Sequence, residues 1–367
     1  MGARRPRRPR RAPSRRGGAP VPGAHPGCAG DRAPRRDPAS ARSGGSPRRT
    51  GARGAPAPAG PRGIPATGPD VSERFFCSDA SVERGEPLHG TASTVQRWLL
   101  VEQSGAWGAQ ALRDNALGRE VGARLQRLGR TLGARVLLIR RHGRYEQRGH
   151  RVFAAFTGRG SRWLERLDFA DAEAILAHDF GPLRQGSSVG GVVERELHAF
   201  VCTHGKHDPC CAKKGRLIAH ALADSHPETV WETSHIGGDR FAGNVLFLPL
   251  GIYYGRVEAP QATRLMNRLA AGKLDLPHYR GRTSYPFAAQ AAEWLVRERL
   301  TLVGLDELRL EAHEATDLGV RTTFRRPDGK LVTIEVEETA AAPARLTCRA
   351  NDEHRAPGWR LHSLREH

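Results

Sequence analysis

The order of apolar runs between residues 95 and 271 constrains the fold more than any other feature of the sequence. Runs rich in β-branched and aromatic residues predict strands, and stretches with apolar residues on one face predict helices. The first half is expected to run strand, helix, three strands, helix, at 95–101, 117–132, 135–139, 152–156, 162–167 and 171–178. The same order is expected again at 197–202, 209–224, 229–234, 244–248, 252–254 and 261–271. This region is therefore predicted to be one small α/β fold used twice in tandem.

Breaks in the pattern divide the chain further. A Gly/Ser-rich stretch at 186–191 separates the two α/β units, which we assign to residues 90–185 and 190–275. From residue 283 an amphipathic helix at 287–300 precedes strands at 308–311, 320–324 and 331–336, and Asp328-Gly329 indicates a hairpin turn. A last strand is expected at 346–348. Residues 283–350 are thus predicted to form a smaller α+β module without a chemical motif.

The net charge of +19 suggests a polyanionic partner until it is mapped along the chain. Residues 1–70 contain 16 arginines, three acidic residues and 14 of the 25 prolines, but no aromatic residue. Such a segment has too little apolar surface to offset the entropy of ordering, so we expect a disordered basic tail. A nucleic-acid-binding arm is one interpretation. A start codon assigned too early is favoured, because no aromatic residues are interleaved for base stacking.

Composition also excludes several classes of protein. No apolar run approaches the ~18 residues of a membrane span, so no membrane association is expected. The N-terminus lacks the apolar core of a secretory signal. Six cysteines in 367 residues do not form a disulfide scaffold. We therefore expect a cytoplasmic protein with reduced thiols.

Reactive side chains are concentrated between residues 202 and 240. Three thiols and two imidazoles fall within ten residues, namely Cys202, His204, His207, Cys210 and Cys211. Cys202 ends a predicted strand, and Cys211 lies in the first turn of the next helix, which Asp208 is expected to cap and Pro209 to begin. A helix N-terminus stabilises a thiolate. Cys202 and Cys211 are therefore expected to lie close together.

A second reactive stretch, residues 234–242, also follows a predicted strand. It contains His235, two glycines that permit positive φ, and Asp239. Two strand ends at one edge of a sheet, bearing soft and borderline ligands, suit a metal site. Cys202, Cys211, His235 and one further group could hold zinc or a [2Fe–2S] cluster. A redox disulfide between Cys202 and Cys211 is a third option, and spacing alone leaves all three open.

The region 197–257 resembles the sucrase/ferredoxin-like family, a set of thioredoxin-like [2Fe–2S] ferredoxins. The matching residues are Cys202-x-His204, Asp208, Cys211, His235-Ile-Gly-Gly and Phe241-Ala, and Gly90-Thr-Ala and Trp98 extend the resemblance to residues 90–275. The resemblance implies tandem thioredoxin-like units, of which the second carries the ligands. It also implies that two cysteines and two histidines hold the cluster, and these fall on Cys202, Cys211, His235 and, for the second histidine, Asp239.

The aspartate at position 239 is a departure from that pattern, because a carboxylate is a hard oxygen ligand. Three options follow: Asp239 is a ligand, another side chain replaces it, or no cluster is bound. The candidate replacements are Cys210, His204, His207 and Cys77. Otherwise Cys77 and Cys348 are expected to be ordinary thiols.

The function predicted from these observations is a [2Fe–2S] electron carrier or redox sensor with an unidentified redox partner protein. The alternatives are a thiol-disulfide oxidoreductase, or a zinc-bound or metal-free binding module on the same fold. Electron transfer is favoured over catalysis. Sucrase activity is not supported, because the motif lacks the paired carboxylates of a glycosidase.

Overall fold

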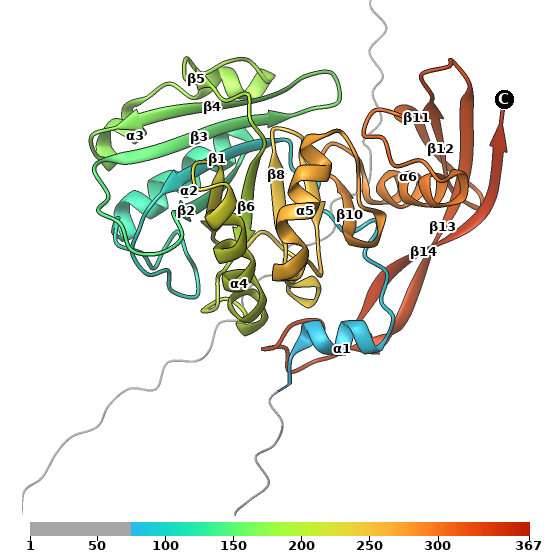
Figure 1. The fold of residues 1–367 in the computed structure, drawn as a ribbon, viewed down its shortest axis with the longest axis horizontal. Coiled ribbons are helices and arrows are strands. Elements are labelled where there is room, and N and C mark those ends of the chain that lie inside the picture. Colours follow the sequence, from blue (N-terminus) through green and yellow to red (C-terminus); the bar gives the residue numbers. More distant parts are fainter. Residues whose placement is uncertain (1–74) are drawn as a thin grey trace, which may run out of the picture. The chain divides into compact units, whose positions relative to one another are not determined.

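The computed structural model describes residues 75–367, which contain two β-sheets (Figure 1). The predicted basic tail at 1–70 lies outside the described residues. A ten-stranded sheet has the order β10-β9-β8-β6-β7-β2-β1-β3-β4-β5, and a four-stranded sheet has the order β11-β12-β13-β14. Within residues 75–367, no helix is both long and apolar enough to cross a membrane.

The first half of the large sheet is built from β1, β2, β3 and β4. Its elements are β1 (Arg97–Glu102), α2 (Arg119–Leu132), β2 (Arg135–Arg140), β3 (His150–Thr157), β4 (Arg162–Phe169), α3 (Ala172–Ala177), the 3-10 helix η1 (Gly181–Gln185) and the short edge strand β5 (Val192–Val193). Strand β1 pairs parallel with β2 and antiparallel with β3, and β3 pairs antiparallel with β4. The predicted elements are confirmed, whereas β5 was not expected.

The second half repeats this arrangement. Its elements are β6 (His198–Cys202), α4 (Pro209–Ser225), β7 (Val230–Thr233), the 3-10 helix η2 (Asp239–Phe241), β8 (Val245–Leu248), β9 (Ile252–Tyr254), α5 (Ala259–Ala270), the 3-10 helix η3 (Leu276–His278) and β10 (Tyr279–Arg282). Strand β6 pairs parallel with β7 and antiparallel with β8, which pairs antiparallel with β9. Both halves therefore have the thioredoxin-like strand order that was predicted.

An antiparallel pairing of β2 with β7 joins the two halves into one continuous sheet. Helices α4 and α5 cover one core of the second half, and α2 and α3 cover one core of the first. A third core consists of residues from strands and loops, apart from Cys211 of α4. There Phe153 of β3 contacts Phe200 of β6 and Trp231 of β7, with ring centroids 5.9 and 5.3 Å apart. Because β3 and β6 are not neighbours in the sheet, these contacts require the sheet to curl onto its own inner face.

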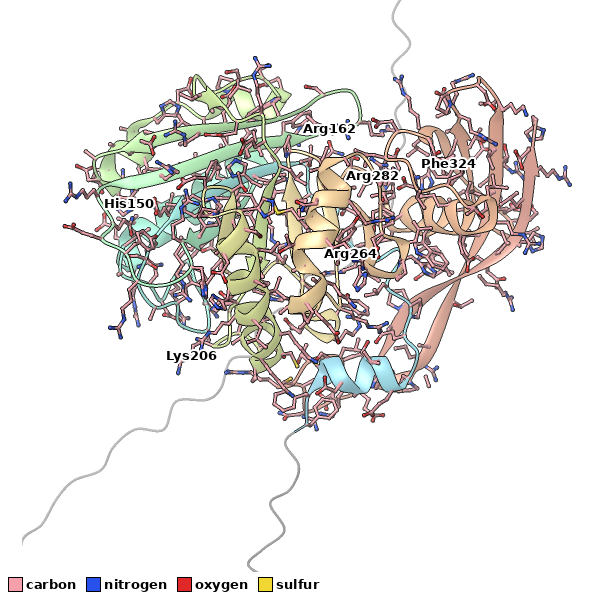
Figure 2. All side chains as sticks on the ribbon, viewed as in Figure 1. His150, Arg162, Lys206, Arg264, Arg282 and Phe324 are labelled. Carbon is pink, nitrogen blue, oxygen red and sulfur yellow. The ribbon has the colours of Figure 1, made fainter. Side chains whose placement is uncertain are left out.

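The C-terminal part consists of α6 (Phe287–Leu300) packed on β11 (Arg309–Thr316), β12 (Gly319–Arg325), β13 (Leu331–Ala344) and β14 (His354–Glu366). Phe324, buried on β12, lies in this core (Figure 2). The α+β composition is confirmed. The predicted strand at 346–348 is wrong, because β13 continues to Ala344 and residues 345–353 form the connection to β14. The module also extends beyond residue 350, since β14 ends at Glu366.

Helix α6 is anchored to the large sheet by a buried ion cluster. Glu293 Oε1 accepts hydrogen bonds from Arg282 Nε of β10 and from Arg297 Nε, at 2.9 and 3.0 Å. Glu293 Oε2 accepts a hydrogen bond from Tyr279 Oη at 2.8 Å. Arg282 lies beside α6, where β10 forms the edge of the sheet (Figure 2). A short helix that was not predicted, α1 (Cys77–Glu83), precedes the whole arrangement.

Candidate metal centre

The thiols of the candidate site are positioned by the junction of β6 and α4. Asp208 caps α4, since its Oδ1 accepts the Cys210 N–H at 2.8 Å, and Pro209 is the first residue of the helix, as predicted. Gly215 allows close packing of α4 on β6, because a Cβ at this position would lie 2.0 Å from the carbonyl oxygen of Cys202. Cys202 at the strand end and Cys211 in the first helical turn are therefore held together, although nine positions separate them.

The loop after β7 supplies the other donors. Gly237 and Gly238 both have positive φ, at 98° and 81°, which turns the chain so that Asp239 comes back beside His235. Arg280 holds this turn from behind, with Nη1 donating to the Gly237 carbonyl at 3.0 Å and to Asn244 Oδ1 at 2.8 Å. A second bond runs from Asn244 Nδ2 to the Gly238 carbonyl at 2.7 Å.

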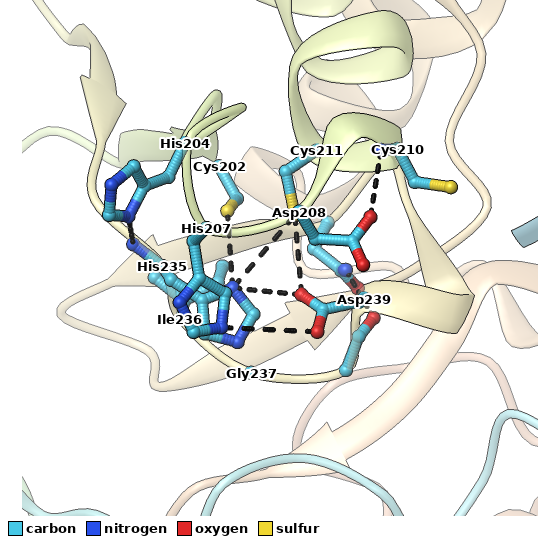
Figure 3. Close-up of polar contacts among 12 residues, drawn as sticks. Cys202, His204, His207, Asp208, Cys210, Cys211, His235, Ile236, Gly237 and Asp239 are labelled. Atoms are coloured by element: carbon cyan, nitrogen blue, oxygen red, sulfur yellow. Dashed lines mark hydrogen bonds and ion pairs between the residues drawn. The ribbon is translucent and has the colours of Figure 1, made fainter. Parts of the chain in front are cut away.

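Four side chains from these two loops converge (Figure 3). His235 Nδ1 lies 3.9 Å from Cys202 Sγ, 3.8 Å from Cys211 Sγ and 3.1 Å from Asp239 Oδ1. Asp239 Oδ1 is 3.5 Å from Cys211 Sγ. Both cysteines are only 1% exposed, and the His235 side chain is 17% exposed. The two sulfurs, the ring nitrogen and the carboxylate oxygen thus form a buried donor set, in which the His235 side chain is the most exposed member.

The electrostatics of the donor set favour a thiolate at Cys202. Its pKa lies well below the usual range, because the Cys211 thiol hydrogen-bonds to it and His235 adds a second hydrogen bond and positive charge. The hydrogen bond with Cys202 raises the pKa of Cys211, and burial adds to this effect. Burial raises the pKa of Asp239. Although burial opposes it, the bond to Cys202 raises the pKa of His235.

Two neighbouring histidines are candidate replacements for Asp239. His204 uses both ring nitrogens elsewhere: Nε2 contacts the Gly108 carbonyl at 2.6 Å, and Nδ1 accepts the His235 N–H at 3.3 Å. His207 stacks on His235 with centroids 3.9 Å apart, and its Nε2 lies 4.0 Å from Asp239 Oδ2. Of the two, only His207 is close to the donor set, at its outer side.

Two cysteines are also candidate replacements. The side chain of Cys210 points away from Cys211 (Figure 3) and packs with Cys77 and Cys348 instead. Neither Cys210 nor Cys77 belongs to the group formed by Cys202, Cys211 and His235. Asp239 contacts Cys211 and His235 and forms a second group with His207 and His235. The expectation that Cys77 and Cys348 are ordinary thiols is wrong, because each contacts two other sulfurs.

The buried arginine behind the site was missed by sequence reasoning. Arg280 is 2% exposed, and burial lowers its pKa to about 10. It lies more than 40 positions from the loop that it supports, and no local pattern marks it among many arginines. The related sign in the sequence is the glycine at position 238. A Cβ at this position would lie 2.5 Å from Nη2 of Arg280, so the guanidinium requires a residue without a side chain there.

A cleft of about 600 Å³ opens on the exposed side of His235. His204 and His207 line it on one side, and α2 and the loop before it line the other. Three arginines are also among its lining residues, namely Arg113, Arg119 and Arg135. The donor set therefore meets the surface beneath a positively charged cleft.

Residues 88–281 match the family described as sucrase/ferredoxin-like, and this match spans more than half of the chain. The chain belongs to the sucrase/ferredoxin-like family. The matched region contains both halves of the large sheet and every residue of the donor set.

Individual relatives of this family member are more distant. Altered inheritance of mitochondria protein 32 of Saccharomyces cerevisiae is 30% identical, over 35% of this chain and 48% of the yeast protein. The chain thus matches about half the length of that relative. Two solved variants, Cys55Ser and Cys59Ser, of the thioredoxin-like [2Fe-2S] ferredoxin from Aquifex aeolicus are 18% identical. Each covers 23% of this chain and 99% of its own, with a TM-score of 0.21.

Proposed function

We propose that this protein binds a [2Fe–2S] cluster and serves as a one-electron carrier or redox sensor. Cys202, Cys211, His235 and Asp239 are the proposed ligands. The observation that carries the proposal is the convergence of two thiols, an imidazole and a carboxylate, with neighbouring donor atoms 3.1 to 3.9 Å apart. Four protein ligands are what a [2Fe–2S] cluster requires, and mixed cysteine and histidine ligation is known chemistry for it. When bound, the cluster takes up and releases one electron.

Asp239 is proposed as the fourth ligand in preference to His207. Its carboxylate is buried and touches both His235 and Cys211, whereas the His207 side chain is 40% exposed. Asp239 is also fixed by its backbone, because it begins η2 directly after the two glycines with positive φ. His207 is instead suited to shield the ring of His235 from solvent, on which it stacks.

Electron exchange is proposed to occur at His235. The thiols are buried, so the imidazole is the part of the donor set nearest to a partner protein. The arginines of the adjoining cleft favour an acidic partner, which their charge would attract and orient. A cytoplasmic location for this exchange stays a prediction.

A thiol-disulfide oxidoreductase is less well supported by the geometry. Such an enzyme needs a thiolate that a disulfide substrate can reach. Cys202 and Cys211 are each 1% exposed, and His235, His207 and Asp239 lie over them. A mononuclear zinc ion remains the competing occupant, because the same four donor types also suit zinc.

The test is anaerobic purification with analysis of iron, acid-labile sulfide and zinc, on the wild type and two serine variants. We expect iron and sulfide in equal amounts in the wild type and their loss in Cys211→Ser. Cys348→Ser is the matched control, because it removes a thiol outside the donor set and should keep the iron. A colourless wild type without iron or sulfide, even after reconstitution, would overturn the proposal.

A further inference from the structure

Three cysteines outside the donor set lie together on the far side of the α4 N-terminus. Cys210 Sγ is 3.2 Å from Cys348 Sγ and 3.7 Å from Cys77 Sγ, and the third pair is 3.6 Å apart. They come from α1, from α4 and from the connection between β13 and β14, three segments that lie side by side (Figure 1). Cys77 and Cys348 are 271 positions apart in the chain. We call these residues, together with Asp208, the Cys77 cluster.

The carboxylate of Asp208 completes this group. Its two oxygens lie 3.8 and 4.0 Å from Cys77 Sγ, and the side chain is almost fully buried. The four donor atoms all lie within 4.8 Å of one another. A plain helix cap does not explain this arrangement, because the second oxygen is turned towards the thiols and accepts the Cys348 N–H at 2.8 Å.

The distances match a tetrahedral metal site. A zinc ion with Zn–S bonds of about 2.3 Å keeps its sulfurs about 3.8 Å apart, and a carboxylate oxygen slightly closer. The observed sulfur–sulfur distances of 3.2, 3.6 and 3.7 Å are close to this value and well above a disulfide bond of about 2.05 Å.

The surroundings of the Cys77 cluster also suit a metal ion. The Asp208 carboxylate is oriented by two backbone N–H groups, those of Cys210 and Cys348, each at 2.8 Å. Cys348 Sγ accepts the Cys77 N–H at 3.3 Å. In metal sites, hydrogen bonds of this kind orient the side chains that bind the metal.

We propose that Cys77, Cys210, Cys348 and Asp208 bind a single structural zinc ion, separate from the centre at Cys202. Soft thiolates favour zinc over the hard divalent cations. The bound ion would tie α1 and the β13–β14 connection to the first turn of α4. Binding replaces the thiol protons with the metal, and these protons are released to solvent.

The experiment measures zinc and iron per chain in the full-length protein, expressed with both metals and purified without chelator. We expect one zinc in the wild type, loss of zinc but not iron in Cys348→Ser, and loss of iron but not zinc in Cys202→Ser. Zinc retained in Cys348→Ser, or a wild type free of zinc, would overturn the proposal. The Cys202→Ser variant separates its failure from that of the proposed function, because the iron and the zinc are read independently.

A second measurement covers the case in which Cys348→Ser does not fold. The wild type is then loaded with Co²⁺ in place of zinc and its visible spectrum recorded. Sulfur-to-cobalt charge transfer and intense ligand-field bands are expected from a tetrahedral thiolate site, with one cobalt per chain in Cys202→Ser. An octahedral, weakly absorbing spectrum, or mass spectrometry that finds a Cys210–Cys348 disulfide in the native protein, would overturn the zinc site.

Discussion

The sharpest test of how the candidate site is built is Gly238→Ala. Gly238 has φ of +81°, and an added Cβ would lie 2.5 Å from Arg280 Nη2 and 2.8 Å from its Cζ. The guanidinium is buried and cannot move into solvent. It must give up its hydrogen bonds to the Gly237 carbonyl or to Asn244 Oδ1.

The expected loss of stability has two parts. An alanine at positive φ costs about 1 kcal/mol. Displacing the charged hydrogen bonds of a buried arginine costs a further ~2 to 3 kcal/mol. The total for Gly238→Ala is therefore about 3 to 4 kcal/mol, and the turn that carries Asp239 should shift, so that bound iron falls as well.

Gly190→Ala is the matched control. Gly190 has nearly the same φ, +83°, but no atom within 4 Å of the position of an added Cβ. The Gly190→Ala variant should therefore lose only ~1 kcal/mol of unfolding free energy, from backbone strain, and keep its iron. The measurements are urea unfolding under anaerobic conditions and iron per chain. If Gly238→Ala is no less stable than Gly190→Ala and binds as much iron, Arg280 does not support the site as described.

Three further outcomes are expected. Glu293→Gln should lower the free energy of unfolding by about 3 to 5 kcal/mol, because it leaves two buried arginines unpaired. Glu314→Gln, at the exposed ion pair with Arg321, should change it by less than ~0.5 kcal/mol. Burial lowers the pKa of His89 from 6.5 to about 4, so the free energy of unfolding should fall as pH drops from 6.5 to 4, and His89→Phe should reduce this fall by about 3 kcal/mol. Asp239→His should keep the cluster and add a second histidine ligand, visible as an additional nitrogen coupling in EPR-based spectra.

The repeated strand order was predictable because local patterns determine it. Apolar runs and helix faces mark each element, and Asp208 followed by Pro209 marks the start of α4. The proximity of Cys202 and Cys211 followed from the strand–loop–helix order. The meeting of Cys211 with His235 and Asp239 followed only with the added premise that both loops leave the same edge of one sheet.

The positions of α1, Cys348 and Arg280 depend on contacts between distant parts of the chain, which no local sequence pattern indicates. Helix α1 is short, and its placement rests on Cys77 meeting residues more than 130 positions away. The sequence predicts a strand around Cys348, because Leu346-Thr-Cys is apolar enough for one, whereas in the structure the Cys348 N–H donates to Asp208. Arg280 could not be distinguished from other arginines, because its role depends on the curl of the sheet and on the turn that it supports.

The central claim is that two cysteines, one histidine and one aspartate hold a [2Fe–2S] cluster. EPR of the anaerobically purified, dithionite-reduced protein, with histidine labelled by ¹⁵N, tests it most directly. The account predicts a spin-½ signal with equal amounts of iron and sulfide and coupling to one histidine nitrogen, which His235→Ala abolishes and His207→Ala leaves in place. A folded protein with no such signal after reconstitution, or coupling that persists in His235→Ala, would contradict it.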